Sequence, residues 1–525
     1  MFGVTRLIDR AALLNARGTA SIFQDSELTW TQFADRVARL AGVLRSLGLQ
    51  PGDRVGILSH NSEFYFEYLF AVAWAGGVIT PINARLTAAE ATYWLQDSGC
   101  SIVFVDPALR PLMEEVRPIL GAQIKHLILV GEGQAGEGAA PPGYRSLADL
   151  LEGATPVADA GRGGDDLFAI YYTGGTTGRS KGVMLTHAGL LLNLFQWNSV
   201  IGLGAHDRLL IVAPMFHMVA AFNSVIAALL GASVVIVPRF DPRAVLEAIQ
   251  RHRVTKAALV PAMIDSLLSF PEVANYDLGS LRRISYGGAP MPEALLRRSL
   301  EVLPQTAFFQ IYGQTEGGPN ICCLEPQHHV LEGPNARRLR SAGRPLPAVE
   351  VAIFDEQGAP RAHGETGEIC VRAPALSPGY WQRPEETRES RRDGWLRTGD
   401  VGYLDDEGFV FIVDRLKDMI VTGGVNVYSA EVENALHSHP AVRECAVIGV
   451  PDAHWGERVH AIVRIDAAAS ADAETLRTHC REFLADFKCP RSFEFVDEPL
   501  PRNAANKILK RQLRDPYWRN QERKI

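Results

Sequence analysis

The chain has 525 residues, more than one hydrophobic core usually supports, so two or more domains are expected. Hydrophobic residues make up 47% and charged residues 22%, as in an ordinary globular protein. The formal net charge of −7 disfavours a nucleic-acid-binding protein, which would carry a basic face. Seven scattered cysteines without a Cys-x-x-Cys pair predict a reducing, cytoplasmic location rather than a disulfide scaffold.

Two stretches bear on membrane association. Residues 1–20 carry charges throughout and lack a long apolar core, so no signal peptide is expected. Residues 219–238 are apolar for longer, but Gly231 divides them into a helical half and a β-branched half. We therefore expect a buried helix followed by a buried strand, and no transmembrane segment.

The first part of the chain alternates between predicted helices and strands. Apolar periodicity predicts helices over 29–47, 63–75 and 87–96, and strands over 55–58, 78–82 and 102–105. Strands separated by helices of this length imply parallel pairing with right-handed crossovers. Residues 131–143, rich in Gly, Ala and Pro, are expected to form a surface excursion.

A glycine-rich loop follows the strand predicted over 167–171. The residues of this loop that could bind an anion are Thr173, Gly174, Gly175, Thr176, Thr177, Gly178 and Lys181. Glycine backbone N–H groups can converge on one anion, threonine hydroxyls add donors, and the lysine adds a positive charge. The spacing is not that of a Walker A loop, because two residues separate Gly178 from Lys181. The pattern indicates a polyphosphate-binding loop, with a Gly/Thr surface turn as the alternative.

The alternation resumes after this loop and changes character near residue 364. The pattern predicts strands over 209–213, 234–237, 257–260, 284–286 and 308–311, and helices over 243–251 and 292–302. Residues 364–413 are β-like and predict an antiparallel layer that closes the large domain. A charged joint, 414–418, precedes a compact α+β pattern with helices over 430–437 and 473–487 and strands over 446–450 and 459–465.

Polar residues follow the strand predicted over 308–311. They are Tyr312, Gly313, Gln314, Thr315 and Glu316. Strand ends are where α/β sheets present ligand-binding groups. An aromatic ring can stack on a purine, a hydroxyl can donate to a phosphate, and a carboxylate can hold Mg²⁺. The alternative for the Thr-Glu pair is a helix cap.

Further motifs lie toward the C-terminus, and each has a structural alternative. Asp400 follows a glycine turn and could accept both ribose hydroxyls, or it could simply stand in a β-turn. Gly423 and Gly424 form a turn before a helix. Lys507 lies in a basic tail with Lys510, Arg511, Arg514 and Arg519, where a lysine is normally solvated.

These motifs together resemble those of the acyl-adenylate-forming superfamily, which includes the acyl-CoA synthetases, the adenylation domains of peptide synthetases and the beetle luciferases. The resemblance covers nearly the whole chain. The phosphate loop departs at Gly174, where serine is common, and at Ser180, where proline is common. The C-terminal lysine motif departs at Asn506, where glycine is usual, although asparagine tolerates positive φ.

The resemblance implies a role for each matching residue in nucleotide binding. The glycine-rich loop and Lys181 would hold the β- and γ-phosphates. Thr315 would contact the α-phosphate and Glu316 would ligate Mg²⁺, while Asp400 and Arg415 would hold the ribose or a phosphate. The residues implied around the adenine are Gly288, Ala289, Pro290, Tyr312 and Gly313.

The resemblance also implies roles in acyl transfer. Lys507 would contact the α-phosphate and the attacking carboxylate, and Lys417 would be the hinge between domain orientations. Gly423 and Gly424 would form the pantetheine turn, with Val425 and Ser429 in place of the more usual glutamate and proline. Gly287 and Gln314 would lie near the acid substrate. His217 would either gate the acyl and pantetheine route or be structural.

The implied fold is α/β, with a large N-terminal domain (1–414) of parallel and mixed sheets, helices and a β layer. A hinge (415–417) would connect it to a small mobile α+β domain (418–525). The implied reaction joins a carboxylate to ATP, giving acyl-AMP and pyrophosphate, and then transfers the acyl group to a thiol. ATP and Mg²⁺ are the expected cofactors. Coenzyme A is the expected thiol substrate, because no carrier-protein segment follows.

Several points stay open from the sequence. The acid is expected to be hydrophobic, because residues 216–226 are apolar, but aliphatic, aryl and polycyclic acids all fit. An acyl-AMP ligase that loads a separate carrier protein is one alternative. A non-catalytic nucleotide-binding module with an inactive lysine loop is another. A homodimer is a possible assembly, and no nucleic acid partner is expected.

Overall fold

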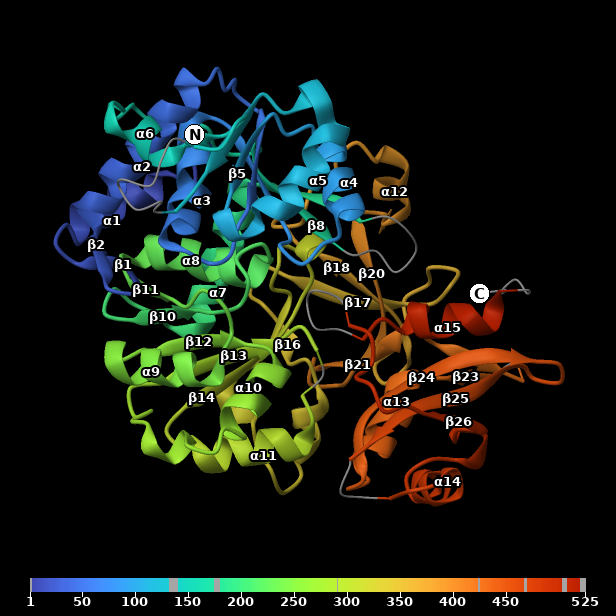
Figure 1. Ribbon diagram of the computed structural model, residues 1–525. Coiled ribbons are helices and arrows are strands. Elements are labelled where there is room, and N and C mark those ends of the chain that lie inside the picture. Colours follow the sequence, from blue (N-terminus) through green and yellow to red (C-terminus); the bar gives the residue numbers. More distant parts are fainter. Residues whose placement is uncertain are drawn as a thin grey trace. The chain divides into compact units, whose positions relative to one another are not determined.

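The computed structural model describes residues 2–131, 140–173, 180–289, 291–423, 425–466, 470–502 and 508–519 (Figure 1). The chain divides into two compact units. The first comprises Met1–Glu350 and Val371–Leu396, and the second comprises Val351–Cys370 and Arg397–Ile525. The domain boundary expected at the charged joint stays a prediction.

One sheet of the first unit carries most of the candidate site residues. It contains β1 (Thr19–Phe23), β2 (Ser26–Thr29), β10 (Arg208–Ile211), β11 (Ser233–Ile236), β12 (Lys256–Leu259), β13 (Arg283–Gly287), β14 (Ala307–Tyr312), β15 (Cys322–Leu324) and β16 (Arg344–Pro345). The strand order is β16-β15-β14-β13-β12-β10-β11-β1-β2. The central strands are parallel, as predicted, whereas β2, β15 and β16 pair antiparallel.

Another sheet of the first unit leads into the glycine-rich loop. It contains β3 (Arg54–Leu58), β4 (Val78–Ile82), β5 (Ile102–Val105), β6 (His126–Leu129), β7 (Arg145–Ser146), β8 (Leu167–Thr173) and β9 (Lys181–Thr186). The strand order is β7-β6-β5-β3-β4-β8-β9. All of these pairs are parallel except β8 with β9, which are antiparallel neighbours on either side of the loop.

The helices of the first unit include those predicted over 29–47, 63–75, 87–96, 243–251 and 292–302. They are α1 (Arg6–Leu14), α2 (Trp30–Ser46), α3 (Glu63–Ala75), α4 (Ala88–Ser98), α5 (Arg110–Leu120), α6 (Leu147–Glu152), α7 (His187–Ile201), α8 (Met218–Leu230), α9 (Pro242–His252), α10 (Pro261–Leu268), α11 (Glu293–Val302) and α12 (Pro384–Glu389). Capping boxes begin α2, at Thr29 and Gln32, and α4, at Thr87 and Glu90. Apolar faces of α9, α10 and α11 share one buried cluster with β10 to β14 (Figure 1).

The second unit is a smaller α+β body. Most residues of one sheet belong to it, with β17 (Glu350–Phe354), β18 (Gly367–Arg372), β19 (Arg391–Arg392), β20 (Trp395–Leu404) and β21 (Val410–Arg415). A further sheet contains β22 (Ile420–Thr422), β23 (Val425–Val427), β24 (Val442–Asp452), β25 (Gly456–Ile465) and β26 (Ser492–Phe495). Its helices are α13 (Ser429–His437), α14 (Ala473–Arg481) and α15 (Lys510–Trp518). Buried residues of α13, α14, β24 and β25 form its core.

The structure corrects the sequence-based elements in two places. The predicted helix over 473–487 ends at Arg481, because Phe483 and Phe487, which extended the apolar pattern, are 59% and 39% exposed. The hairpin of β1 and β2 was not predicted, and β1 extends the sheet by pairing with β11. The predicted buried helix and strand over 219–238 are confirmed as α8 and β11.

Two further expectations concern cysteines and membranes. The seven cysteines all fall within the described ranges and are buried free thiols. Among the described residues, the longest apolar helices remain too short to cross a bilayer.

A buried lysine in the first unit makes its stability depend on pH. Lys256 begins β12, and its ammonium donates to Asn223 Oδ1 on α8. Burial lowers the pKa of Lys256 to about 7. Between about pH 7 and its unfolded pKa, roughly 10.4, the unfolded chain holds a proton that the folded chain has released. The free energy of unfolding therefore rises with pH, by up to about 1.4 kcal/mol per pH unit.

We predict that Lys256→Met removes this contribution. Urea unfolding of the wild type and the variant between pH 7.5 and 9 would measure it, since other titrating groups cancel in the comparison. The wild type should gain stability relative to the variant as pH rises. Parallel pH profiles would show that the buried lysine stays charged.

Candidate active site

A carboxylate from one sheet meets hydroxyls from two other segments of the first unit. Glu316 stands in the turn after β14, and its Oε1 atom accepts a hydrogen bond from Thr173 Oγ1 at 3.3 Å. The same oxygen accepts from Tyr380 Oη at 3.1 Å. Thr173 ends β8 and Tyr380 follows β18, so residues far apart in sequence converge here. The Glu316 side chain thus contacts neighbouring segments rather than capping a helix.

Lys181 lies beside the same cluster. It begins β9 and stands opposite Thr173 in the antiparallel pair, so the two residues flank the glycine-rich loop. Its ammonium lies 4.9 Å from the centroid of the Tyr380 ring, within the range of a cation–π interaction. The structure therefore brings together Thr173, Lys181 and Glu316, which the sequence had linked to phosphate and metal binding.

Tyr380 was missed by sequence reasoning. It follows Pro378-Gly379, a dipeptide typical of turns. The backbone places it, because Val183 and Tyr380 form an antiparallel bridge and Trp381 N donates to Gly182 O at 2.7 Å. The adjacency to the glycine-rich loop is tertiary, so no local pattern could have revealed it.

Close backbone approaches explain the glycines at the ends of β13 and β14. A Cβ at Gly287 would lie 2.2 Å from Ile311 O on the neighbouring strand. Gly288 has a φ of 77°, which favours glycine. A Cβ at Gly313 would lie 1.9 Å from Pro319 O. These residues, with exposed Ala289, leave bare backbone at the carboxyl edge of the sheet, where ligands bind in open α/β folds.

The turn after β14 sets the directions of its polar side chains. Tyr312 ends the strand and is buried. Gln314 precedes the 3₁₀ turn Thr315–Gly317, and Gly317 N donates to Gln314 O at 2.9 Å. Ser377 N donates to Glu316 O at 3.0 Å, which fixes the turn against the segment that carries Tyr380.

His217 lies in the segment that connects β10 to α8. It immediately precedes α8, and its backbone N–H donates to Pro214 O at 2.9 Å. Its ring packs edge-on against Phe216, with centroids 4.7 Å apart. The gating and structural interpretations of His217 both stay open.

The two residues expected at the ribose form an ion pair in the second unit. Asp400 on β20 and Arg415 on β21 stand opposite each other in the antiparallel pair. Arg415 Nε lies 2.8 Å from Asp400 Oδ1, and the aspartate side chain is 5% exposed. Thr398 Oγ1 accepts from Asp400 N at 3.1 Å and donates to Ile369 O at 2.7 Å. Asp400 is thus held by Thr398 on its own strand and by Arg415 on the neighbouring strand.

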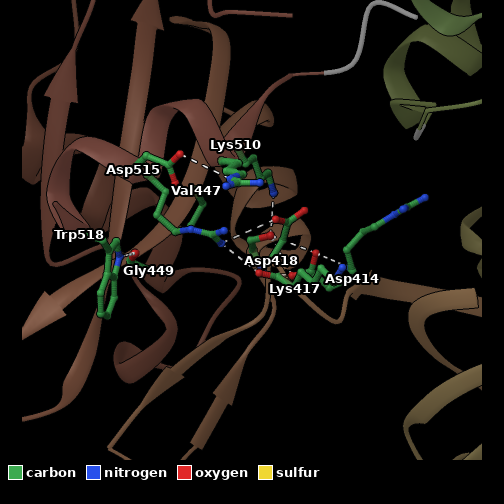
Figure 2. A network of polar contacts seen from close by, with 12 residues as sticks. Asp414, Lys417, Asp418, Val447, Gly449, Lys510, Asp515 and Trp518 are labelled. Carbon is green, nitrogen blue, oxygen red and sulfur yellow. Dashed lines mark hydrogen bonds and ion pairs between the residues drawn. The ribbon is translucent and has the colours of Figure 1, made fainter. Parts of the chain in front are cut away.

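A buried ammonium group organises the region around the expected hinge. Figure 2 shows Lys510 pointing toward the segment that carries Asp414, Lys417 and Asp418. Lys510 Nζ lies 2.7 Å from Glu433 Oε1 and donates to Ser429 Oγ at 2.6 Å. Burial disfavours its charge, but attraction to Glu433 and Asp414 prevails and raises the pKa of Lys510.

Ser429 connects this lysine to the joint. Its hydroxyl donates to Asp414 Oδ2 at 2.8 Å, and its backbone N–H donates to the same carboxylate. Burial raises the pKa of Asp414, while Lys510 and Ser429 oppose the shift. A proline, more usual here in the resembling family, could supply neither donor.

Helix α15 is fixed at its middle and at its C-terminal end. Arg514 Nη1 donates to Lys417 O at 3.0 Å and lies 4.0 Å from Asp418. Trp518 Nε1 donates to Gly449 O at 2.9 Å, on β24 (Figure 2). The view of Lys510 and Arg514 as solvated charge was therefore wrong: their side chains are 15% and 14% exposed, because acidic partners compensate their burial.

Of the two glycines in the expected pantetheine turn, Gly423 lies within the described residues. Its φ is 59°, and a Cβ there would lie 2.6 Å from Trp455 Cε3. Gly423 N also donates to Trp455 O at 2.8 Å. Several expected site residues lie outside the described residues: Gly174, Gly175, Thr176, Thr177, Gly178, Pro290, Gly424 and Lys507.

A magnesium ion fits this site only as a partner of phosphate. Within the described ranges, His, Cys, Asp and Glu form no group of three or more that could hold a metal. Mg²⁺ commonly binds one or two carboxylates together with substrate phosphates and waters. The Glu316 carboxylate, beside the phosphate-loop residues Thr173 and Lys181, matches that donor set.

Comparison with known proteins gives a consistent result. The AMP-binding enzyme family matches residues 8–381, and the AMP-binding enzyme C-terminal domain matches residues 431–507. Feruloyl-CoA synthase of an Amycolatopsis species is 40% identical over 96% of this chain and 97% of that protein. Fatty acid–[acyl-carrier-protein] ligase ScoC of Streptomyces coeruleorubidus is 38% identical over 96% of this chain and 95% of that protein.

A solved structure agrees with these relatives. The o-succinylbenzoate CoA synthetase MenE of Bacillus subtilis, in complex with its acyl-adenylate intermediate, matches with a TM-score of 0.84 and 31% identity. The match covers 97% of this chain and 98% of that one. The chain therefore belongs to the family of AMP-binding enzymes, the acyl-adenylate-forming superfamily that its motifs resemble.

Proposed function

We propose that this enzyme activates a hydrophobic carboxylic acid with ATP, releases pyrophosphate and transfers the acyl group from acyl-AMP to coenzyme A. The observation that carries the proposal is the convergence of Thr173, Lys181 and Glu316 at the mouth of the glycine-rich loop. A carboxylate resists attack by a thiol because its carbonyl is electron-rich and lacks a good leaving group. A mixed anhydride with AMP removes both obstacles.

The residues act by positioning and by charge stabilisation. Thr173 and Lys181 hold the terminal phosphates with the loop between them. Bound Mg²⁺ would neutralise phosphate charge, and Glu316 is the residue that would hold it. Gly287, Gly288 and Ala289 leave room for the adenine beside Tyr312, and Thr315 reaches the α-phosphate.

The remaining contacts to the nucleotide are proposed for residues of the second unit. Asp400 and Arg415 are proposed to hold the ribose, exchanging their mutual ion pair for the hydroxyl groups. Lys507 is proposed to contact the α-phosphate and the acid. The proposed division is a domain over 1–414, a hinge over 415–417 and a mobile domain over 418–525. Rotation about Lys417 would then present Gly423 and Gly424 for the thiol step.

The proposal also names the acyl acceptor and the class of acid. Feruloyl-CoA synthase and the o-succinylbenzoate CoA synthetase support coenzyme A as the acceptor. The similarity to ScoC supports the alternative, transfer to a separate carrier protein. Aliphatic and aryl acids are both represented in the names of these relatives, and the apolar helix α8 suits either class. A cytoplasmic location and a homodimer stay predictions.

A substrate screen tests the proposal. We expect AMP release with at least one hydrophobic acid, and a thioester product by mass spectrometry only when coenzyme A is added. Product on a phosphopantetheinylated carrier protein, but not on coenzyme A, would favour the alternative acceptor. AMP release with none of the fatty, aryl and polycyclic acids would contradict the proposed function.

The role of Lys507 predicts a split between the two half-reactions. Lys507→Ala should lose acyl-AMP formation by several hundredfold, as expected for losing a charge that stabilises the transition state. It should retain thioester formation from supplied acyl-AMP. Stopped assays of each half-reaction measure the split, with Arg511→Ala, a solvated neighbour paired with Asp515, as the control. Equal loss of both half-reactions would refute the assignment.

The hinge predicts a second split, of the opposite kind. Proline fixes φ and removes the N–H, so Lys417→Pro should trap one orientation of the second unit. The trapped enzyme should keep acyl-AMP formation and lose thioester formation. Lys417→Ala leaves φ free and should retain both. A folded Lys417→Pro protein that makes acyl-CoA at the wild-type rate would exclude rotation at this residue.

A further inference from the structure

The Glu316 carboxylate is held asymmetrically. Both hydroxyl donors, Thr173 Oγ1 and Tyr380 Oη, bind Oε1. In the described part of the chain, Oε2 accepts no hydrogen bond. A carboxylate constrained in this way presents one oxygen that is already satisfied and one that is available to a ligand.

Tyr380, one of the two donors, is held firmly by its backbone. Its backbone is anchored on both sides, by the bridge to Val183 and by a 2.9 Å hydrogen bond from Tyr380 N to Thr387 Oγ1. Thr173, the other donor, ends β8 and is paired with Lys181 in β9. The Tyr380 hydroxyl donates to the Glu316 carboxylate at 3.1 Å, and a carboxylate can only accept.

The ring of Tyr380 makes a second contact, with Lys181. Lys181 Nζ lies over it at 4.9 Å, so the same side chain supports the ammonium through its π face and the carboxylate through its hydroxyl. The two opposite charges are thereby held on different parts of one fixed side chain. A tyrosine whose side chain served only to fill the core would make neither of these contacts.

We infer that Tyr380 is a positioning residue for nucleotide binding, which orients Glu316 so that Oε2 faces the phosphate-bound divalent cation and steadies Lys181 for the terminal phosphates. The inference rests on the proposed function, since it takes Glu316 as the metal ligand. The two parts of the side chain have different roles: the hydroxyl orients the metal ligand Glu316, and the ring supports Lys181, which binds the phosphates.

Binding measurements can separate these effects without turnover. Titration calorimetry with α,β-methylene-ATP, in the presence and absence of Mn²⁺, gives the factor by which metal strengthens nucleotide binding. Tyr380→Phe should lower this factor about tenfold, as expected for the loss of a hydrogen bond to a charged group. It should leave metal-free binding unchanged, because the ring remains under Lys181. Tyr380→Leu should weaken metal-free binding as well.

Tyr172→Phe is the matched control. Tyr172 precedes Thr173, and its hydroxyl donates to another carboxylate, Asp97 Oδ2, at 2.7 Å. The variant makes the same chemical change beside the loop and should leave the metal factor unaltered. An equal fall of the factor in Tyr172→Phe and Tyr380→Phe would show a merely structural effect and overturn the inference.

Glu316→Gln separates failure of this inference from failure of the proposed function. If Glu316→Gln abolishes the metal factor while Tyr380→Phe leaves it intact, the positioning role of Tyr380 falls and the metal role of Glu316 stands. If Glu316→Gln also leaves the factor intact, Glu316 is no metal ligand, and both assignments fall. Loss in Glu316→Gln with a partial loss in Tyr380→Phe supports the inference.

Discussion

A single carboxylate oxygen, Glu316 Oε1, joins three segments of the first unit that lie far apart in the sequence. It accepts hydrogen bonds from the end of β8 and from the segment after β18, and it stands at the end of β14. These contacts tie the two large sheets together at the place where the glycine-rich loop begins. The rest of the candidate site depends on this arrangement, because the phosphate-loop residues and the acidic residue are useful only side by side.

The second unit is organised by a different constraint, the burial of a positive charge. Lys510 can lie inside the unit only because Glu433 and Asp414 offset the cost of removing its charge from water. Ser429 relays the contact to Asp414 with donors that proline lacks. Since Arg514 also binds the carbonyl of Lys417, helix α15 and the proposed hinge share one polar network.

Sequence periodicity predicted much of the fold, because buried parallel strands and amphipathic helices carry strong local signals. The helix Glu63–Ala75 and the strand Val78–Ile82 were predicted to the residue. Prediction failed where a local pattern had no tertiary support, as at exposed Phe483 and Phe487. It also failed at the N-terminal strand β1, whose place is set by the distant partner β11.

The site shows the same division between local and tertiary information. Thr173, Lys181 and Glu316 were recognisable because glycine turns and strand ends mark ligand-binding positions. Tyr380 was not, because its role arises only when the chain folds back against the loop. Lys510 and Arg514 were taken for solvated charge, because a basic tail gives no sign of the distant acidic residues that bury it. The comparisons establish the family, while the geometry indicates which residues the reaction would use.

Acid-dependent exchange of labelled pyrophosphate into ATP reports reversible acyl-AMP formation without any acceptor, and therefore tests whether this enzyme adenylates a carboxylic acid. We expect exchange that requires both a hydrophobic carboxylic acid and Mg²⁺, and that needs neither coenzyme A nor a carrier protein. Absence of exchange with every acid class, from a folded enzyme that still binds ATP, would contradict the account and leave a nucleotide-binding module without ligase activity.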